Sequence, residues 1–491
     1  MQTVAKMGML AQSKVKFSEE FGKVQKFDLI VIGTGPAGEK AAVKAAYFGH
    51  RVAIIEKEDV YGGAEVVTGT LPSKTLKETA LFLSGKYEKG LYGIERGLEH
   101  EASVEDFMYR KNFVSASAAQ EILQNLTRHG VTIFHGIASF EDTHTIKVKG
   151  EKEERISGEH IIIATGSYPY HPLGIPFDGK RIHDSDTILL IRRFPSSLCI
   201  VGAGVIGCEY ATIFATMGTK VYLVNDKEHI LPFVDHEIST ELVTQMQSAN
   251  VEILFNKTIE EIKPAASEKE MISVRLKSGE KLSVDMFLFA AGRSGNTKEL
   301  HCDKIGLNIG TREQVFVDAQ YRTNIPHIYA VGDVIGFPAL ASTSMDQGRV
   351  AVAHIFQTQD LEHLPSHFPY GIYTVPEVSM VGITEEEAIK RNLNYCVGKA
   401  RYSDMPRGKI LGAKSGFLKL IFSRDELRVL GVHVIGQLAT ELIHYGVMLV
   451  EEKKNLNDLI GQVFNFPTLH ELYKYAGYDG LSNYTGHKVK L

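Results

Sequence analysis

The sequence predicts an α/β fold built from two similar strand–turn–helix–strand units and a C-terminal region of α+β character. Three observations predict it. Glycine-rich turns with the same spacing follow strand-like segments at two places in the chain. Residues 363–491 alternate between strand-like and helical segments without such a turn. Finally, 491 residues exceed the length at which one hydrophobic core stops growing, so two or three domains are expected.

The first unit occupies residues 28–56. The strand Asp28–Ile32 leads into the turn, a helix follows over Glu39–Phe48, and Arg51–Glu56 is a buried strand that ends in a carboxylate. The turn carries three glycines: Gly33, Gly35 and Gly38.

The second unit repeats this plan. The strand Leu198–Val201 leads into its turn, a helix ends near Met217, and a strand that starts at Lys220 ends at Asn225. The turn again carries three glycines: Gly202, Gly204 and Gly207. Glu56 and Asn225 therefore stand at the same distance beyond the last glycine of their turns.

The glycines have separate tasks in such a turn. The first permits the tight turn, the second lets the backbone approach a pyrophosphate, and the third lets the helix pack on the strand. Packing alone would explain one turn of this kind. Two in register, each within a full strand–turn–helix–strand context, predict two Rossmann-like dinucleotide-binding units.

The composition excludes several classes of protein. The chain is 44% hydrophobic and 23% charged, with a mean hydropathy of −0.07, as in ordinary globular proteins. Lys and Arg number 54 against 59 Asp and Glu, and this net charge of −5 offers no basic field for nucleic acid. The longest apolar stretches, such as 161–164 and 286–291, are too short to span a bilayer. We therefore expect neither nucleic acid nor a membrane as a partner.

The cysteines indicate a reducing compartment. They form no CxxC or CxxxxC pair, and none has a neighbouring histidine at the spacing of a zinc site. The four are Cys199, Cys208, Cys302 and Cys396. We expect a cytoplasmic protein without a metal site, in which Cys199 and Cys208 are buried apolar filling.

Other segments carry a resemblance to a known family. Short strands run into glycine at Ile161–Gly166, Phe287–Arg293 and Ile328–Asp333. Together with the two turns and the segment Gly62–Lys74, they resemble the pyridine nucleotide-disulfide oxidoreductases from about residue 27 to the C-terminus. The resemblance implies FAD and NAD(P) sites and a homodimer or a larger assembly. It divides the chain into a mobile arm (1–26), a FAD-binding domain (27–183 and 293–362), an NAD(P)-binding domain (184–292) and a dimerisation domain (363–491).

The chain departs from the family pattern where the family carries its thiol chemistry. Glu65 and Thr70 stand at the positions of the two redox cysteines, and Phe466 stands at the position of the histidine that serves them. Disulfide reduction is therefore excluded on chemical grounds. We expect the Phe466–Pro467 bond to be cis, and a structural role is the favoured reading of nearby His470.

Within this family, the chain most resembles the soluble members that move hydride between NADPH and NAD. The strings that carry this likeness are Gly166–Pro172, Asp184–Asp186, Gly202–Tyr210, Gly292–Thr297, Ala330–Gly336, Asp346–Gly348 and Gly371–Glu377. The implied activity is transhydrogenation by a ping-pong route through the flavin, with no redox disulfide.

The same resemblance implies the site residues. The FAD contacts are Gly33, Gly35, Gly38, Glu56, Gly62, Gly63, Thr70, Lys74, Ala138, Thr165, Gly166, Asp333 and Ala341. The NAD(P) contacts are Gly202, Gly204, Gly207, Glu209, Asn225, Lys227 and Gly292. Glu56 accepts ribose hydroxyls, Asp333 holds the ribityl chain, and a helix that begins near Ala341 faces the flavin. Lys74 lies near flavin N5 and pairs with Glu209, and both are assigned to catalysis.

Position 225 bears on the choice of nucleotide. A carboxylate there would hold the 2′-hydroxyl of NAD and repel the 2′-phosphate of NADP. Asn225 removes that repulsion, and Lys227 or His229 is near enough in sequence to approach the phosphate, so we expect both nucleotides to be accepted. An ionised Glu65 next to the flavin would lower its reduction potential.

Two other functions stay open at this point. One is a diaphorase or oxidase that passes electrons from NAD(P)H to a quinone or to oxygen. The other is a FAD-bearing interaction or sensor protein without catalysis, in which Lys74 and Glu209 are solvated surface charges. Two intact glycine turns argue against the second alternative.

Overall fold

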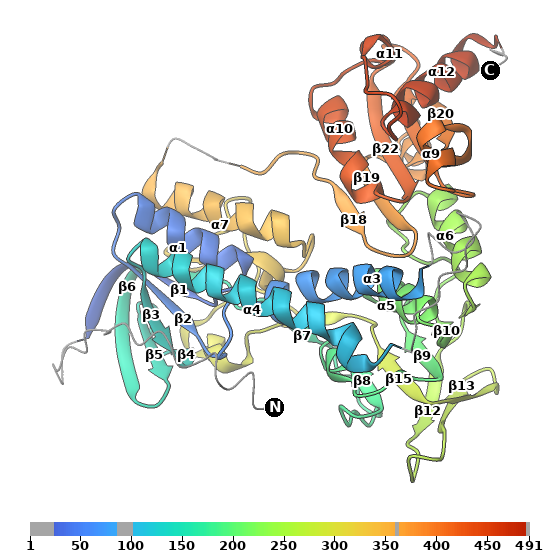
Figure 1. The fold of residues 1–491 in the computed structure, drawn as a ribbon. Coiled ribbons are helices and arrows are strands. Elements are labelled where there is room, and N and C mark those ends of the chain that lie inside the picture. Colours follow the sequence, from blue (N-terminus) through green and yellow to red (C-terminus); the bar gives the residue numbers. More distant parts are fainter. Residues whose placement is uncertain (1–23, 86–101, 359–362, 488–491) are drawn as a thin grey trace.

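The computed structural model describes residues 24–85, 102–358 and 363–487 (Figure 1). Three sheets organise the chain, one at the left of Figure 1, one at the lower right and one at the upper right. Nearly all of the expected mobile arm, 1–26, lies outside the described residues. Its last two residues, Gln25 and Lys26, instead belong to the first strand.

The first sheet has seven strands and contains the first glycine turn. Its order is β3-β2-β1-β6-β5-β4, and β17 pairs with β6. These strands are β1 (Gln25–Ile32), β2 (Val52–Glu56), β3 (Thr132–His135), β4 (Ile137–Phe140), β5 (Thr145–Lys149), β6 (Glu153–Ile163) and β17 (Ile328–Ala330). All five residues of β2 are buried, as expected of a parallel strand with both faces covered. The helices α1 (Pro36–Tyr47) and α7 (Ala341–Phe356) lie side by side over this sheet (Figure 1).

The second sheet contains the second glycine turn. It is parallel, with the order β11-β10-β9-β15-β8. Its elements are β8 (Ile182–Asp184), β9 (Ser197–Val201), α5 (Val205–Thr216), β10 (Lys220–Val224), α6 (His236–Ser248), β11 (Val251–Leu254) and β15 (Met286–Phe289). A three-stranded antiparallel sheet adjoins it, made of β12 (Ile259–Lys263), β13 (Ile272–Leu276) and β14 (Lys281–Val284). The short strands β7 (Ser167–Pro169) and β16 (Arg293–Gly295) pair where the chain crosses between the first two sheets.

The two glycine turns have nearly the same geometry. Gly33 and Gly202 have φ values of +104° and +100°, in the region that favours glycine. A Cβ on Gly38 would lie 1.9 Å from the carbonyl oxygen of Gly33, and one on Gly207 would lie 1.8 Å from that of Gly202. Only glycine permits these approaches of helix to turn, so the packing task assigned to the third glycine is seen in both units.

The third sheet belongs to the C-terminal region. It is antiparallel, with the order β18-β19-β22-β21-β20. Its strands are β18 (Tyr370–Ile372), β19 (Glu377–Gly382), β20 (Tyr395–Arg401), β21 (Phe417–Ser423) and β22 (Val429–Gly436). The accompanying helices are α8 (Glu385–Lys390), α9 (Pro406–Ile410), α10 (Ala439–Glu451), α11 (Leu456–Gly461) and α12 (Glu471–Thr485). The expected α+β character is thus confirmed.

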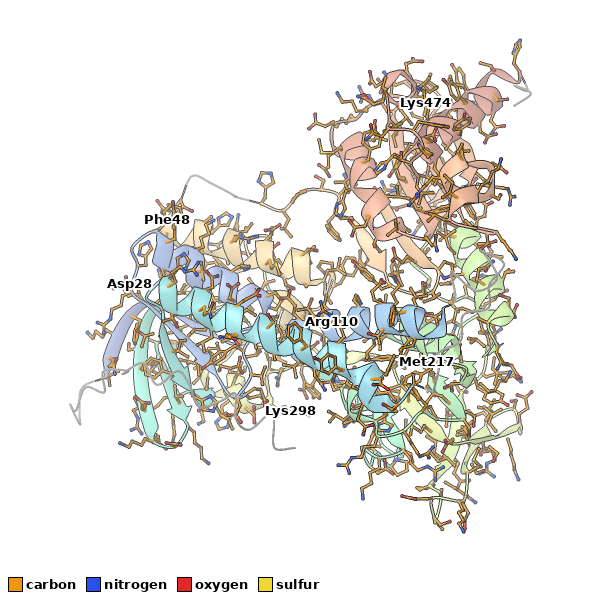
Figure 2. All side chains as sticks on the ribbon, viewed as in Figure 1. Asp28, Phe48, Arg110, Met217, Lys298 and Lys474 are labelled. Atoms are coloured by element: carbon orange, nitrogen blue, oxygen red, sulfur yellow. The ribbon has the colours of Figure 1, made fainter. Side chains whose placement is uncertain are left out.

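Helix α3 (Thr70–Ser84) connects the regions around the three large sheets. It follows the short helix α2 (Gly63–Val67), packs along α4 (Val104–Arg128), and also contacts α5 of the second sheet. The third sheet lies above α3 in the view of Figure 2. Nζ of Lys77 on α3 lies 2.5 Å from a carboxylate oxygen of Glu377 on β19. This ion pair is buried, with side-chain exposures of 4% and 7%. Charges are buried at such a place only when they are paired.

The structure differs from the expected elements at several ends. Helix α1 begins at Pro36 and not at Glu39, because proline at the first helical turn has no N–H to lose. The antiparallel strands β4, β5 and β12–β14 were not expected from the pattern, since they are short and partly exposed. The Phe466–Pro467 bond is cis as expected.

No described helix combines the length and the apolar character needed to cross a bilayer. All four cysteines are buried and free. Burial raises the pKa of the Cys199 thiol to about 12, so this side chain stays an uncharged, apolar filler. Across the described ranges, no three His, Cys, Asp or Glu side chains gather as metal ligands would.

Candidate active site

A single cavity of about 1540 Å³ joins the two nucleotide-binding units. Residues of the first and third sheets, of α3 and of α5 line it. Many of the residues expected to bind FAD lie on its wall: Gly33, Gly35, Glu56, Gly63, Thr70, Lys74, Ala138, Thr165, Gly166, Asp333 and Ala341. Gly204, Glu209 and Gly292 line it from the side of the second unit. Four of the expected glycines do not line the cavity: Gly38, Gly62, Gly202 and Gly207.

The carboxylate of Glu56 is fixed at the end of β2. One oxygen accepts hydrogen bonds from the backbone N–H groups of Lys57 and Glu58, at 2.8 and 3.0 Å. The other accepts from the backbone N–H and the hydroxyl of Thr34 in the glycine turn. The turn and the carboxylate are therefore held as one unit, with Glu56 only 7% exposed.

The wall of the first unit fits a polar dinucleotide. The hydroxyl of Thr165 is buried on the cavity wall and has no hydrogen-bond partner among the described residues. Such a group is rare unless a ligand or water satisfies it. No atom would lie within 4 Å of a Cβ placed on Gly35, so the backbone at the middle of the turn is open to the cavity. Asp333 accepts a hydrogen bond from the Ser167 hydroxyl at 3.0 Å and presents its carboxylate on the same wall.

Lys74 and Glu209 join α3 to α5 across this cavity. Nζ of Lys74 lies 2.9 Å from both carboxylate oxygens of Glu209. The backbone N–H of Tyr373 and the hydroxyl of Ser73 also donate to that carboxylate, at 2.9 and 3.4 Å. Glu209 is 4% exposed and Lys74 25%, so the anion is desolvated while the ammonium still reaches the cavity. The pairing expected from the sequence is confirmed.

Glu65 and Thr70, at the positions of the family cysteines, both line the cavity. Burial raises the pKa of the Glu65 carboxyl, and nearby Glu39 raises it further, while Lys40 acts in the opposite direction. Neither residue can form or break a bond to sulfur. Phe466 does not line the cavity of its own chain, and its side chain is 72% exposed.

Asn225 and Lys227 lie apart from the other expected residues. Asn225 follows β10 and is 5% exposed, and its amide donates hydrogen bonds to the carbonyl oxygens of Lys227 and His229, at 3.1 and 2.9 Å. This amide shapes the loop after β10. Neither Asn225 nor Lys227 lines the cavity, so their contact with a nucleotide stays a prediction.

Arg293, to which the sequence pattern assigned no role, also lines the cavity. It donates to the Ser167 hydroxyl and carbonyl, both at 2.8 Å, and to Asp186 at 3.2 Å. Burial raises the pKa of the Asp186 carboxyl, while Arg293 acts to lower it. Because Ser167 also donates to Asp333, one chain of hydrogen bonds crosses from the second unit to the first. The Gly292–Arg293 string carried the resemblance, but no spacing rule connected it to Asp186.

Comparison with protein families decides the relationship. The family described as "Pyridine nucleotide-disulphide oxidoreductase" matches residues 27–348, and its dimerisation domain matches residues 368–476. The chain belongs to the pyridine nucleotide-disulphide oxidoreductase family. FAD is the cofactor of this family, and the cavity described above has the groups to hold it.

Two relatives with high similarity to the chain have the same name. Proteins called soluble pyridine nucleotide transhydrogenase from Mycobacterium tuberculosis and Azotobacter vinelandii are each 40% identical to the chain. The alignment with the first covers 459 residues, 93% of this chain and 97% of the relative. That with the second covers 464 residues, 94% of this chain and 99% of the relative.

Two solved structures share the fold over nearly the whole chain. The HOCl-induced flavoprotein disulfide reductase RclA from Escherichia coli is 27% identical, with a TM-score of 0.83, and covers 94% of this chain and 100% of its own. LpdA from Mycobacterium tuberculosis is 24% identical, with a TM-score of 0.84, and covers 93% of this chain and 99% of its own. The latter supports the fold alone.

Proposed function

We propose that this protein is a FAD-dependent enzyme that transfers hydride between NADPH and NAD, without a redox disulfide. One observation carries the proposal: the cavity wall holds an intact Lys74–Glu209 pair between the two glycine-turn units, while Glu65 and Thr70 stand where thiols would be. The relatives named soluble pyridine nucleotide transhydrogenase support the same activity.

FAD, when bound in this cavity, would supply the hydride chemistry, because a flavin can take up two electrons from one nicotinamide and give them to another. The chain supplies position and charge. The first glycine turn and Glu56 hold the adenosine and pyrophosphate end, and Asp333 holds the ribityl chain. Lys74 places a positive charge on the cavity wall, where it favours negative charge on the bound cofactor. Glu209 fixes that ammonium through both of its carboxylate oxygens.

The second unit receives both nicotinamide nucleotides in turn. Its glycine turn leads into α5, whose N-terminus favours a pyrophosphate. Asn225 carries no charge, so it does not repel a 2′-phosphate, and Lys227 supplies a nearby cation. Acceptance of both nucleotides follows, which a transhydrogenase requires.

The assembly is a homodimer through residues 363–491. The dimerisation-domain match over residues 368–476 and the exposed Phe466 and Val463 support this. The division at residues 183, 292 and 362 into FAD, NAD(P) and dimerisation domains belongs to the same proposal. The boundary at residue 183 falls within β8, which pairs with β15 of the second sheet. Four buried, free thiols support a cytoplasmic location.

Steady-state kinetics test the function. Purified holoenzyme is supplied with NADPH and a NAD analogue whose reduced form absorbs at a separate wavelength, under argon and in air. Reduced analogue at equal rates under both gases, with parallel double-reciprocal lines, is the expected result. NADPH consumed only in the presence of oxygen or a quinone contradicts the proposal in favour of an oxidase or diaphorase, and unreacted NADPH contradicts it in favour of a non-catalytic FAD protein.

A further inference from the structure

Three aromatic side chains from separate parts of the chain meet at the cavity wall. Phe233 precedes α6, Phe337 follows the short helix Gly332–Ile335, and Tyr370 is the first residue of β18. All three line the cavity. The ring centroid of Tyr370 lies 5.2 Å from that of Phe233 and 6.3 Å from that of Phe337, within the range where aromatic rings attract each other.

Tyr370 anchors this group and the two phenylalanines extend from it. Its hydroxyl donates a hydrogen bond to the carbonyl oxygen of Pro338, at 3.2 Å. Burial raises the pKa of Tyr370 to about 12, so the hydroxyl keeps its proton and stays a donor. Phe337 is 78% exposed and Phe233 is 38% exposed. The outer rings therefore have room to change rotamer around a fixed centre.

The proposed reaction creates a need for such a group. No cysteine lines the cavity, since all four are buried elsewhere in the described chain. The cavity therefore offers no thiol pair that could store the two electrons delivered by the first nucleotide. They must wait at the cofactor until that nucleotide has left and the second has entered. During this interval dioxygen competes for them, taking two electrons and two protons and leaving as hydrogen peroxide.

We propose that Phe233, Phe337 and Tyr370 form an aromatic cap that covers the cavity between the two half-reactions and keeps dioxygen from the waiting electrons. The cap brings together the loop after β10, the segment before α7 and the first strand of the third sheet at the cavity wall. The three rings block the access of dioxygen sterically. The inference rests on the proposed function, because an enzyme that exchanges nucleotides without a thiol store would leave its cofactor reduced during the exchange.

Two measurements on the holoenzyme test the cap without any nicotinamide nucleotide. In the first, chemically reduced holoenzyme under argon is mixed with air-saturated buffer, and the return of flavin absorbance and the peroxide formed are followed. In the second, the quenching of flavin fluorescence by iodide is measured in the oxidised holoenzyme. The variants are Phe337→Ala, Phe233→Ala and Tyr370→Phe. Phe82→Ala is the matched control, because Phe82 on α3 is 80% exposed and lies away from the cavity.

We expect reoxidation of Phe337→Ala and Phe233→Ala to be faster by roughly tenfold, the factor that a barrier lower by about 1.4 kcal/mol gives. The iodide quenching constant should rise in the same two variants. Tyr370→Phe, which loses the hydroxyl but keeps the ring, should show a smaller increase, and Phe82→Ala should match the wild type. Wild-type reoxidation and quenching in both alanine variants, with unchanged circular dichroism, would overturn the cap. Failure of the proposed transhydrogenation would appear only in assays that contain nucleotides, so the two failures are distinguishable.

Discussion

Removal of the Lys74 ammonium is the most informative single change in the site. In Lys74→Met, the Glu209 carboxylate loses both of its 2.9 Å contacts with Nζ and keeps only the Tyr373 N–H and the Ser73 hydroxyl. With 4% of its side chain exposed, it becomes a buried anion without a counter-ion, beside a cofactor that must itself gain negative charge.

The size of the effect follows from this geometry. Breaking a fully buried ion pair costs about 3–5 kcal/mol, and the 25% exposure of Lys74 places this pair below that range. A loss of about 2 kcal/mol at the transition state corresponds to a roughly 30-fold slower reaction. The observable is the rate at which NADPH bleaches the flavin in an anaerobic stopped-flow experiment.

Two further variants separate charge from folding. Lys74→Met combined with Glu209→Gln removes the unpaired anion as well, so part of the rate should return, as expected of coupled neighbours. Lys147→Met is the surface control, because Lys147 pairs with Glu153 at 2.6 Å on an exposed face and should leave the rate unchanged. The reasoning is refuted if Lys74→Met bleaches at the wild-type rate, or if the double variant is slower than the single one.

Three other predictions concern substitutions at Asn225, Glu65 and Lys77. Asn225→Glu should lower kcat/KM for NADPH relative to NADH by roughly tenfold or more, because a carboxylate there repels the 2′-phosphate; an unchanged ratio contradicts the role given to position 225. Glu65→Gln should stabilise the protein at neutral pH, because burial raises the pKa of the Glu65 carboxyl above its ordinary 4.5. The wild type therefore loses stability as pH rises from 4.5 through the raised pKa, whereas the glutamine variant has no group that titrates at this position. Thermal unfolding of both proteins across that window checks this, and a constant difference in Tm would be inconsistent with it. Lys77→Met should destabilise the fold by about 3 kcal/mol, because Glu377 is left buried and unpaired, and adding Glu377→Gln should restore part of the loss in denaturant unfolding; equal stability of the single variant and the wild type would disprove this.

The sequence predicted the parts of the fold that depend on local spacing. Gly38 and Gly207 could be placed because the nearest contact that each permits, with the carbonyl oxygen of Gly33 or of Gly202, lies only a few residues back along the chain. The strand–turn–helix units were therefore found, although the helix expected from Glu39 begins at Pro36.

The pairing of Lys74 with Glu209 could be predicted only from the family resemblance. The two residues are far apart in sequence, and no periodicity relates them. The contact between Arg293 and Asp186 was not predicted for the same reason, because it depends on how β16 pairs with β7.

Two features lay beyond sequence reasoning altogether. The inward amide of Asn225 depends on the path of the loop after β10, which residue types do not specify. The aromatic group of Phe233, Phe337 and Tyr370 draws one ring from each of three sequence regions. Only the assembled fold brings them together.

The proposed reaction requires that the flavin alone holds the two electrons between the two half-reactions. An anaerobic titration measures directly how many electrons the protein takes up per flavin. Holoenzyme is titrated with NADPH until the flavin is bleached, freed of nucleotide by gel filtration, and then mixed with the NAD analogue. We predict one NADPH consumed and one reduced analogue formed per flavin, with no change after treatment with a thiol-alkylating reagent. Two equivalents per flavin, or loss of transfer on alkylation, would reveal a second store and contradict the account.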